Sequence, residues 1–379
     1  EQYFLLPVNL LINVKFFIYI SPNYIYKRNR GEKMSIDPAS KWDSKYAILY
    51  NDKYPKYVWD TWGAQIADWQ ERINPEKLRK ERTERFRAEC KQSGVEVMLL
   101  LLPWNMRYVS GYKPMTYTTG LCYVLAPREG DPIIFAHGTP GIQDRRQMTW
   151  LPPHKVRYSI PACIGMMGSG LWTHPEAWEY QLKKFADQIK ETLKELRLEK
   201  ETLVLDSYDP GAIRALEKVG VKTKADPAVM ERAQEIKTKE EIKCARMSAA
   251  IGDFMMATLA ANIKPGKTEL ELTGLMIHTA MKYGCEPWPH SYVISGPNTW
   301  PIFRNMTDRW IRPGEIVIAD TVHSAWNGYM TCYYRTFCCG RASQAAKDAY
   351  KRIYDWLYGA LKKCKPGNTT KDIVEAFPD

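Results

Sequence analysis

Residues 75–225 alternate between apolar residues at helical spacing and short apolar runs. Asn74-Pro75-Glu76 is a helix start, with an N-cap residue followed by proline, and the helix is predicted to run to about residue 94. The run 95–103 is apolar and bounded by glycine and proline, which is typical of a buried strand. Further strands are predicted over 121–126, 132–136 and 203–206.

A long helix is predicted between the third and fourth of these strands. Thr173-His174-Pro175-Glu176 has the composition of a capping box. Three-to-four spacing then holds for the apolar residues Trp178, Leu182, Phe185, Ile189, Leu193 and Leu196. Alternating helices and strands of this kind predict an α/β domain.

From residue 230 the pattern changes to longer helices followed by strands. Thr238-Lys239-Glu240-Glu241 and Thr268-Glu269-Leu270-Glu271 are capping boxes, and a helix between them is predicted to end at Lys264-Pro265-Gly266. Strands are predicted over 291–295, 315–319 and 328–339. Another helix is predicted to begin at Ser343, and its apolar positions are Tyr350, Ile353, Trp356 or Leu357, and Leu361.

Two helix ends repeat one short motif. Lys264-Pro265-Gly266-Lys267-Thr268 and Lys365-Pro366-Gly367-Asn368-Thr369 each follow a helix and precede a cap. A chance match is one interpretation, and a duplicated unit of about 100 residues is the one we favour. A second unit that has only begun leaves apolar faces uncovered, so we expect the natural protein to continue for roughly another 70–100 residues.

The chain divides into four segments by pattern. Residues 1–33 are expected to be a non-native or anchor segment: 3–20 are apolar but interrupted by proline, asparagine and lysine, which makes them a marginal membrane span. Residues 34–74 are an expected extension, 75–228 the α/β domain, and 229–379 a second domain. Of the two interpretations of residues 1–33, we favour a non-native segment over a membrane anchor.

Composition indicates a folded protein, because 45% of the 379 residues are hydrophobic and 26% are charged. The net charge of +11 is scattered without a basic-aromatic stripe, so we expect no nucleic-acid partner. Nine cysteines without a CxxC pair favour neither a disulfide framework nor a zinc site, and indicate a reducing, cytoplasmic location.

Six motifs in order carry a resemblance to a known family. They are Glu235-Ile236-Lys237-Thr238-Lys239-Glu240-Glu241-Ile242, Lys264-Pro265-Gly266-Lys267-Thr268-Glu269, Ser295-Gly296-Pro297-Asn298, Gly314-Glu315-Ile316-Val317-Ile318-Ala319-Asp320, Gly328-Tyr329, and Arg335-Thr336-Phe337 with Gly340. This region resembles the creatinase, methionine aminopeptidase and aminopeptidase P (pita-bread) superfamily. Residues 78–140 look like its amino-terminal creatinase domain. The resemblance implies an α/β fold: a creatinase-like α/β domain followed by an incomplete, duplicated pita-bread domain.

The resemblance also implies a metal site. Relatives bind two divalent ions, Fe, Mn, Zn or Co, through two Asp, one His and two Glu, and such ions activate water or polarise a substrate. Asp320 matches the first ligand, and Cys332 stands at the second ligand position. The His and two Glu are expected beyond Asp379. A thiolate suits softer ions, so Cys332 is one candidate ligand. The alternative interpretation is that Cys332 is a buried strand cysteine. Two states of the site therefore stay open, a single bound ion and no metal.

Other candidate site residues follow from the same motifs. His290 and Arg335 are candidate catalytic residues, although a packed histidine and a structural salt bridge are the alternatives. Asn298, Phe303 and Trp300 are candidate substrate contacts, and Phe303 stands where related peptidases have histidine. Trp288, Trp300 and Trp310 suit a wall for a cationic substrate by cation–π contact, or are core residues.

Two classes of function remain open at this point. The first is a pita-bread hydrolase or lyase acting on a small zwitterion or an Xaa-Pro dipeptide; the 295–303 segment looks most like the dimethylsulfoniopropionate lyase branch. The second is a catalytically inactive pita-bread protein that serves as a binding or dimerisation module. Relatives are commonly dimers, so we expect a homodimer.

Overall fold

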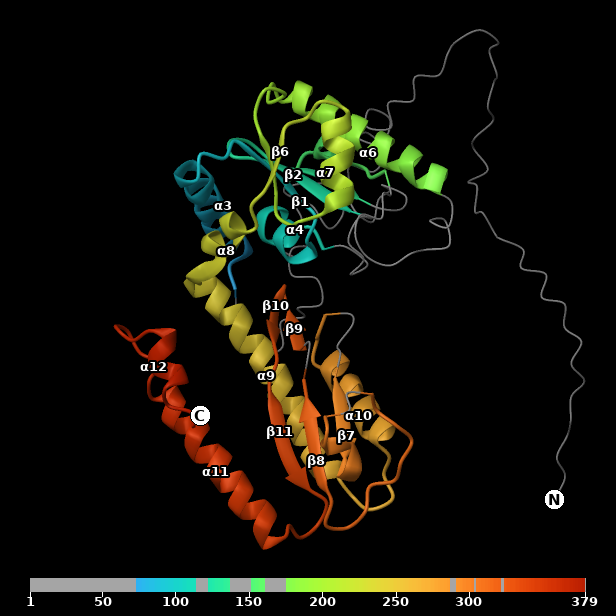
Figure 1. Cartoon of the computed structure of the whole chain (residues 1–379), viewed down its shortest axis with the longest axis vertical. Helices are drawn as coiled ribbons and strands as arrows, with labels where there is room; N and C mark the ends of the chain where they lie inside the picture. Colours follow the sequence, from blue (N-terminus) through green and yellow to red (C-terminus); the bar gives the residue numbers. More distant parts are fainter. Residues whose placement is uncertain are drawn as a thin grey trace, which may run out of the picture. The chain divides into compact units, whose positions relative to one another are not determined.

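The computed structural model describes residues 73–113, 122–136, 151–160, 175–286, 291–302, 305–321 and 324–378 (Figure 1). The amino-terminal part contains α3 (Pro75–Gln92), β1 (Val97–Leu100), α4 (Pro103–Ser110), β2 (Tyr123–Pro127), β3 (Ile133–Ala136), η2 (Pro153–Lys155), β4 (Val156–Tyr158), α6 (Pro175–Glu195), β5 (Leu203–Leu205), α7 (Pro210–Lys218), β6 (Thr223–Ala225) and α8 (Ala228–Glu235). Within these described ranges, no helix is both long and apolar enough to serve as a membrane span.

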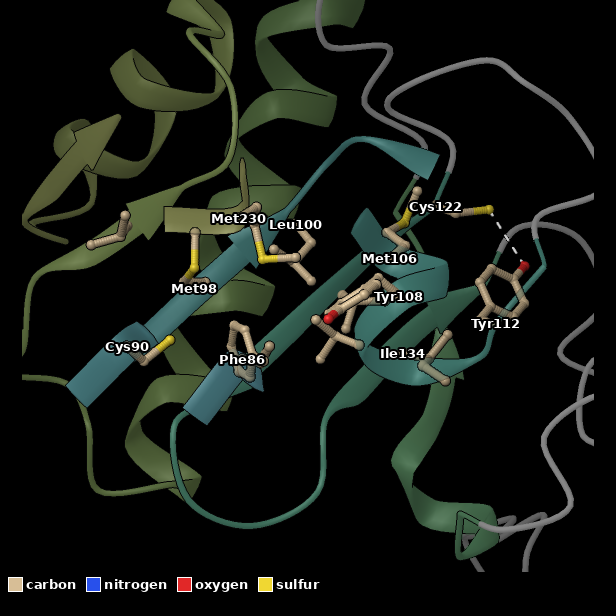
Figure 2. Close-up of a cluster of buried hydrophobic side chains, with 14 of the residues drawn as sticks. Phe86, Cys90, Met98, Leu100, Met106, Tyr108, Tyr112, Cys122, Ile134 and Met230 are labelled. Carbon is tan, nitrogen blue, oxygen red and sulfur yellow. Dashed lines mark hydrogen bonds between the residues drawn. The ribbon is translucent and has the colours of Figure 1, made fainter. Parts of the chain in front are cut away.

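The strands of the amino-terminal part form one mixed sheet in the order β4-β3-β2-β1-β5-β6. Its central strand β1 pairs antiparallel with β2 and parallel with β5. Side chains of β1 alternate between two apolar layers, as a strand buried on both faces requires. Met98 and Leu100 pack with residues of α3, α4 and α8, and Figure 2 shows this cluster. Val97 and Leu99 pack with α6 and α7 on the other face.

The sequence predictions for this part are confirmed where the signal is local. Asn74 caps α3 through its side chain, which accepts a hydrogen bond from the amide of Lys77. On α6, Leu182, Phe185 and Ile189 are buried, as their spacing indicates. The residues of the predicted cap before α6 that precede Pro175 lie outside the described residues. Strands β4 and β6 were not predicted, because each has three residues and a half-exposed pattern.

The carboxy-terminal part contains α9 (Lys239–Asn262), α10 (Glu269–Lys282), β7 (Tyr292–Ser295), η4 (Gly296–Thr299), β8 (Ile316–Asp320), β9 (Ser324–Trp326), β10 (Tyr329–Thr331), β11 (Tyr334–Cys338), α11 (Gln344–Leu361) and α12 (Thr370–Val374). Strands β11, β8 and β7 form an antiparallel sheet with β8 in the middle. Helices α9 and α10 cover one face of it (Figure 1). The predicted single strand 328–339 is wrong, because the chain leaves β10 at Thr331 and starts β11 at Tyr334.

The repeated motif has the same local geometry in both places. Gly266 and Gly367 have φ angles of 84° and 91°, which favour glycine. Thr268 and Thr369 then cap α10 and α12. The two helices that precede the motif differ in packing. Most large apolar residues of α9 are buried, whereas these apolar residues of α11 are all about half exposed: Tyr350, Ile353, Leu357 and Leu361.

An ion pair joins α4 to the segment after α10. Arg107 Nη2 lies 2.7 Å from Glu286 Oε1, and Glu286 Oε2 accepts from the amide of Gly328. Burial opposes ionisation of Glu286, but the charges of Arg107 and Lys113 hold its pKa below the ordinary value. Asn327 and Gly328 form the turn between β9 and β10, and both have positive φ.

We predict that Gly328→Ala destabilises this contact. Gly328 has φ 84°, and a Cβ there would lie 2.9 Å from the Cδ and Nε of Arg107. Gly340→Ala is the matched control, since Gly340 has φ 86° and open space around its Cβ position. Urea unfolding is expected to show Gly328→Ala less stable than Gly340→Ala by about 1–3 kcal/mol. If both variants lost the same free energy of unfolding, the result would mean that Arg107 does not pack on Gly328.

A buried carboxylate caps α4 from a neighbouring strand. Asp206, which follows β5, accepts hydrogen bonds from the amides of Leu101 and Leu102 and from Asn105 Nδ2, at 2.8, 3.2 and 2.9 Å. Burial raises the pKa of Asp206 to about 6 despite these donors. The folded state therefore holds the proton more tightly than the unfolded chain does.

We predict a pH dependence of stability that comes from Asp206. Because its folded pKa is raised from 3.8 to about 6, its contribution is present at low pH and is lost as the pH rises from about 4 to about 6. Asp206→Asn removes this loss, which amounts to at most about 3 kcal/mol. Urea unfolding between pH 4 and 7 measures it, and Asp187→Asn on α6 is the control, because that carboxylate is half exposed and pairs with Lys183. Parallel curves for wild type and Asp206→Asn would contradict the prediction.

Candidate active site

Asp320 lies at the end of the central strand of the carboxy-terminal sheet. Val317 and Ala319 of β8 belong to the core under α9, so alternation directs Asp320 to the opposite face. The register places Tyr292 of β7 and Tyr334 of β11 directly across from it. The two tyrosine rings lie 6.2 Å apart at 63°, and Asp320 is only 1% exposed.

Cys332 is the nearest chemical partner of this carboxylate. Its Sγ lies 3.4 Å from Asp320 Oδ1, in the link between β10 and β11. Cys332 is two residues before Tyr334, which itself pairs with Asp320, so the two side chains meet on one face. Cys332 is exposed, and its predicted interpretation as a buried strand cysteine is therefore wrong.

Two buried hydroxyl groups lie close to Asp320. One belongs to the next residue in the chain, and the other to the residue before Tyr292 on the neighbouring strand. Ser291 precedes β7 and Thr321 follows β8, and the β7–β8 register extended by one residue sets them opposite each other. They are 1% and 0% exposed, and neither hydroxyl has a hydrogen-bond partner in the structure as described. Buried hydroxyls of this kind ordinarily have partners, so this end of the sheet suits a bound polar group.

A buried carboxylate shapes the turn at the other end of β7. Glu269, at the start of α10, is fully buried. It accepts from the amides and hydroxyls of Ser295 and Thr307 at 2.7–3.0 Å, and from Asn298 Nδ2 at 3.0 and 3.1 Å. These bonds fix the η4 turn relative to α10 and the loop that leads to β8.

A second ion pair continues this network to β8. Arg309 forms a two-pronged contact with Glu315, at 2.8 and 2.6 Å, and donates to Ser295 Oγ at 2.7 Å. The hydrogen bonds from Arg309 hold the pKa of Glu315 below its ordinary value. Charged groups therefore hold together the η4 turn, the loop and the residue that directly precedes β8.

The sequence-predicted site residues separate into three groups. Asp320 and Cys332 are brought together, and their role as metal ligands stays a prediction. Asn298 is engaged on Glu269, and Trp300 is 84% exposed. His290 and Phe303 lie outside the described residues, as does Trp288.

Arg335 lies on the opposite face of the sheet from Asp320. It pairs with Ala319 in the register, and its guanidinium lies 4.5 Å from the ring centre of Tyr333. Its Nη1 donates to the carbonyl of Tyr334. Arg335 therefore does not pair with Asp320, and its catalytic role stays a prediction.

The sequence analysis missed two parts of this arrangement. Glu269 was noted only as part of a capping box and of one family motif, and Tyr334 was not singled out. Trp300 and Trp310 were offered as core residues in one interpretation, which is wrong, since they are 84% and 71% exposed. An acidic residue in a helix's first turn, with a Ser-Gly-Pro-Asn turn downstream, is the available signal for the Glu269 network.

Two family models match the chain in succession. The Creatinase/Prolidase N-terminal domain matches residues 82–243, and Metallopeptidase family M24 matches residues 243–379. The chain belongs to the creatinase/aminopeptidase P superfamily. The expected α/β amino-terminal domain and pita-bread domain are thereby confirmed as fold; the predicted boundary at 228/229 stays a prediction.

Similar proteins of this superfamily are named as peptidases. A probable dipeptidase PepE of Mycobacterium bovis is 24% identical over 151 residues, which are 40% of this chain and 40% of that protein. The uncharacterized peptidase YqhT of Bacillus subtilis is 24% identical over 76% of this chain and 74% of its own length. A prolidase structure from Thermococcus sibiricus matches with a TM-score of 0.62 and 24% identity, over 79% of this chain and 76% of that one. That likeness concerns the fold.

The superfamily's metal chemistry can be compared with the donors present. Asp320 and Cys332 supply one oxygen and one sulfur donor, and a borderline ion such as Zn²⁺ accepts both. Within the described residues, no group of three His, Cys, Asp or Glu side chains is close enough to hold an ion. The pair therefore fits two positions of a cation site and does not by itself complete one.

We predict that Glu269→Gln loosens the η4 turn. The amide NH₂ of glutamine would face groups that already donate, so at least one buried donor loses its acceptor, at a cost of about 2–4 kcal/mol. Denaturant unfolding and hydrogen exchange at Ser295 and Thr307 measure the effect. Glu271→Gln is the control in the same helical turn, because Glu271 is exposed and pairs with Lys267. Unchanged exchange in Glu269→Gln would contradict the network's role.

Proposed function

We propose that this protein is a pita-bread hydrolase that acts on dipeptide-sized substrates, Xaa-Pro dipeptides and small zwitterions included, over the sheet face that carries Asp320. The observation that carries the proposal is the buried Asp320 carboxylate, which meets Cys332 at 3.4 Å at the end of the central strand. A buried carboxylate in a polar site is suited to holding a cation. The unpartnered hydroxyls of Ser291 and Thr321 support a bound polar group nearby.

In this proposal Asp320 and Cys332 are ligands of a divalent ion. Such an ion, when bound, polarises a carbonyl and lowers the pKa of water. Asp320 holds its position because β7 and β11 pair on both sides of β8. Tyr292 and Tyr334 flank the carboxylate and give the site aromatic walls, which restrict how a substrate lies.

Hydrolysis is favoured over the lyase reaction by the names of the similar proteins. PepE is named a probable dipeptidase, and YqhT a peptidase. The PepE match spans 40% of that protein, so its activity comes to this chain only as part of the proposal. Cleavage of a peptide bond needs an activated water and a polarised carbonyl, which is the chemistry of a metallopeptidase site.

A second candidate is a binding module that keeps the fold without turnover. The observation that favours it is Cys332 itself, because a thiol at this position replaces a carboxylate that is able to bridge two ions. For hard ions, one thiol and one carboxylate make a weaker binding site than two carboxylates do. In this case the same face binds a peptide or a second subunit without cleaving it.

Metal analysis together with a substrate panel separates the two candidates. The full chain is purified, its Mn, Fe, Co and Zn content is measured, and dipeptides with and without proline are assayed with each ion. Bound metal and turnover that Asp320→Asn abolishes support the hydrolase. No metal and no turnover of any dipeptide support the binding module and contradict the hydrolase.

We predict that Cys332→Asp changes the metal preference of the site. A carboxylate in place of the thiol is expected to tighten Mn²⁺ binding at least tenfold and to weaken the preference for Zn²⁺ over Mn²⁺, because Mn²⁺ prefers oxygen ligands. Isothermal titration of each ion into the full chain measures this. Cys364→Asp is the control, since Cys364 is exposed in the α11–α12 link. Equal Mn²⁺ affinity in wild type and Cys332→Asp would contradict a role for residue 332 as a ligand.

A further inference from the structure

A small cavity lies where α3 and α4 meet the β9–β10 turn. Its volume is about 40 Å³, and its wall includes Arg79, Arg82, Arg107 and Asn327. Among the described residues that line it, none is acidic. Neither Asp320 nor Cys332 lines this cavity. Guanidinium groups that lie around one cavity repel one another at short range, so the partners of each one matter.

Arg82 is the most buried of the three arginines, at 6% exposure. Its Nε and Nη2 donate to the hydroxyl of Tyr329 at 3.1 and 2.7 Å, and its guanidinium lies 5.5 Å from the ring centre of Tyr108. A guanidinium has five N–H groups, and these bonds use two of them. Across the described ranges, no carboxylate lies within ion-pair distance of Arg82. A buried cation without a direct counter-ion is costly, and a bound anion offsets that cost.

The neighbouring carboxylates are already engaged. The Tyr329 hydroxyl donates a hydrogen bond to Glu241 Oε1 at 2.7 Å. Glu241 is therefore connected to Arg82 only through this hydroxyl. Glu286 is shared between Arg107 at 2.7 Å and Lys113 at 3.5 Å. Two cations thus share one carboxylate beside the cavity.

We propose that this cavity binds a single phosphate group, either as inorganic phosphate or as the terminal phosphate of a small phosphomonoester. A cavity needs about 10–15 Å³ for one water molecule, so this one has room for a group of a few heavy atoms. Guanidinium groups bind phosphate oxygens in paired hydrogen bonds, and Arg82 has N–H groups left for them. Because Arg79 and Arg82 belong to α3 and Asn327 to the β9–β10 turn, the phosphate would bridge the two parts of the chain.

Titration calorimetry and thermal unfolding of the full chain with inorganic phosphate test this, at ionic strength held constant with NaCl. Phosphate is expected to raise the melting temperature in proportion to the logarithm of its concentration. Arg82→Gln and Arg79→Gln are each expected to weaken phosphate binding at least tenfold. Arg85→Gln, on the same helix but outside this cavity, is expected to bind as wild type does.

The same titration with glycerol phosphate distinguishes the two candidate ligands, inorganic phosphate and a small phosphomonoester. Binding as tight as that of inorganic phosphate identifies a phosphomonoester site, and binding of inorganic phosphate alone identifies a closed site for the free ion. The half-buried Arg79 keeps the test valid if Arg82→Gln fails to fold, which circular dichroism reports. No stabilisation beyond that of NaCl, or equal phosphate affinity in Arg79→Gln and Arg85→Gln, overturns the proposal. Neither result bears on peptide hydrolysis at Asp320.

Discussion

Side chains alternate between the two faces of a strand, and on β8 this constraint separates the core of the carboxy-terminal part from its candidate site. Val317 and Ala319 are buried under α9, and Asp320 is consequently directed to the other face. Since β8 is paired on both edges, a shift of register by one residue would exchange the two sets of side chains. The apolar packing on α9 therefore also fixes where the carboxylate lies.

Buried polar side chains lie at both ends of β7. At one end Glu269 gathers donors from Ser295, Asn298 and Thr307, so a single buried carboxylate joins α10, the η4 turn and the loop before β8. At the other end Ser291 and Thr321 keep hydroxyls that the described residues leave unpartnered. The first end is a satisfied structural network, whereas the second has unused hydrogen-bonding capacity. This difference is why we assign binding to the end that carries Asp320.

The sequence predicted features that depend on neighbours in the chain. The caps at Asn74 and Thr238 and the helix start at Ser343 were predicted correctly, because a cap is a contact across three residues. Of the predicted site residues, the structure brings Asp320 and Cys332 together; the family resemblance implies both as metal ligands, and that role stays a prediction. The role of Glu269 was not predictable locally, since its partners are 26 to 38 residues away. The division of 328–339 into two strands was missed for a related reason: β10 pairs with β9, whereas β11 pairs with β8.

Zinc-edge X-ray absorption of the full chain tests the central claim, that Cys332 and Asp320 face one cation site, most directly. Coordination by the pair predicts one sulfur neighbour at about 2.3 Å together with oxygen or nitrogen neighbours at about 2.0–2.2 Å. The sulfur signal is expected to vanish in Cys332→Ser and to remain in Cys364→Ser. A zinc ion surrounded only by oxygen and nitrogen, or a sulfur signal that survives Cys332→Ser, would contradict the account.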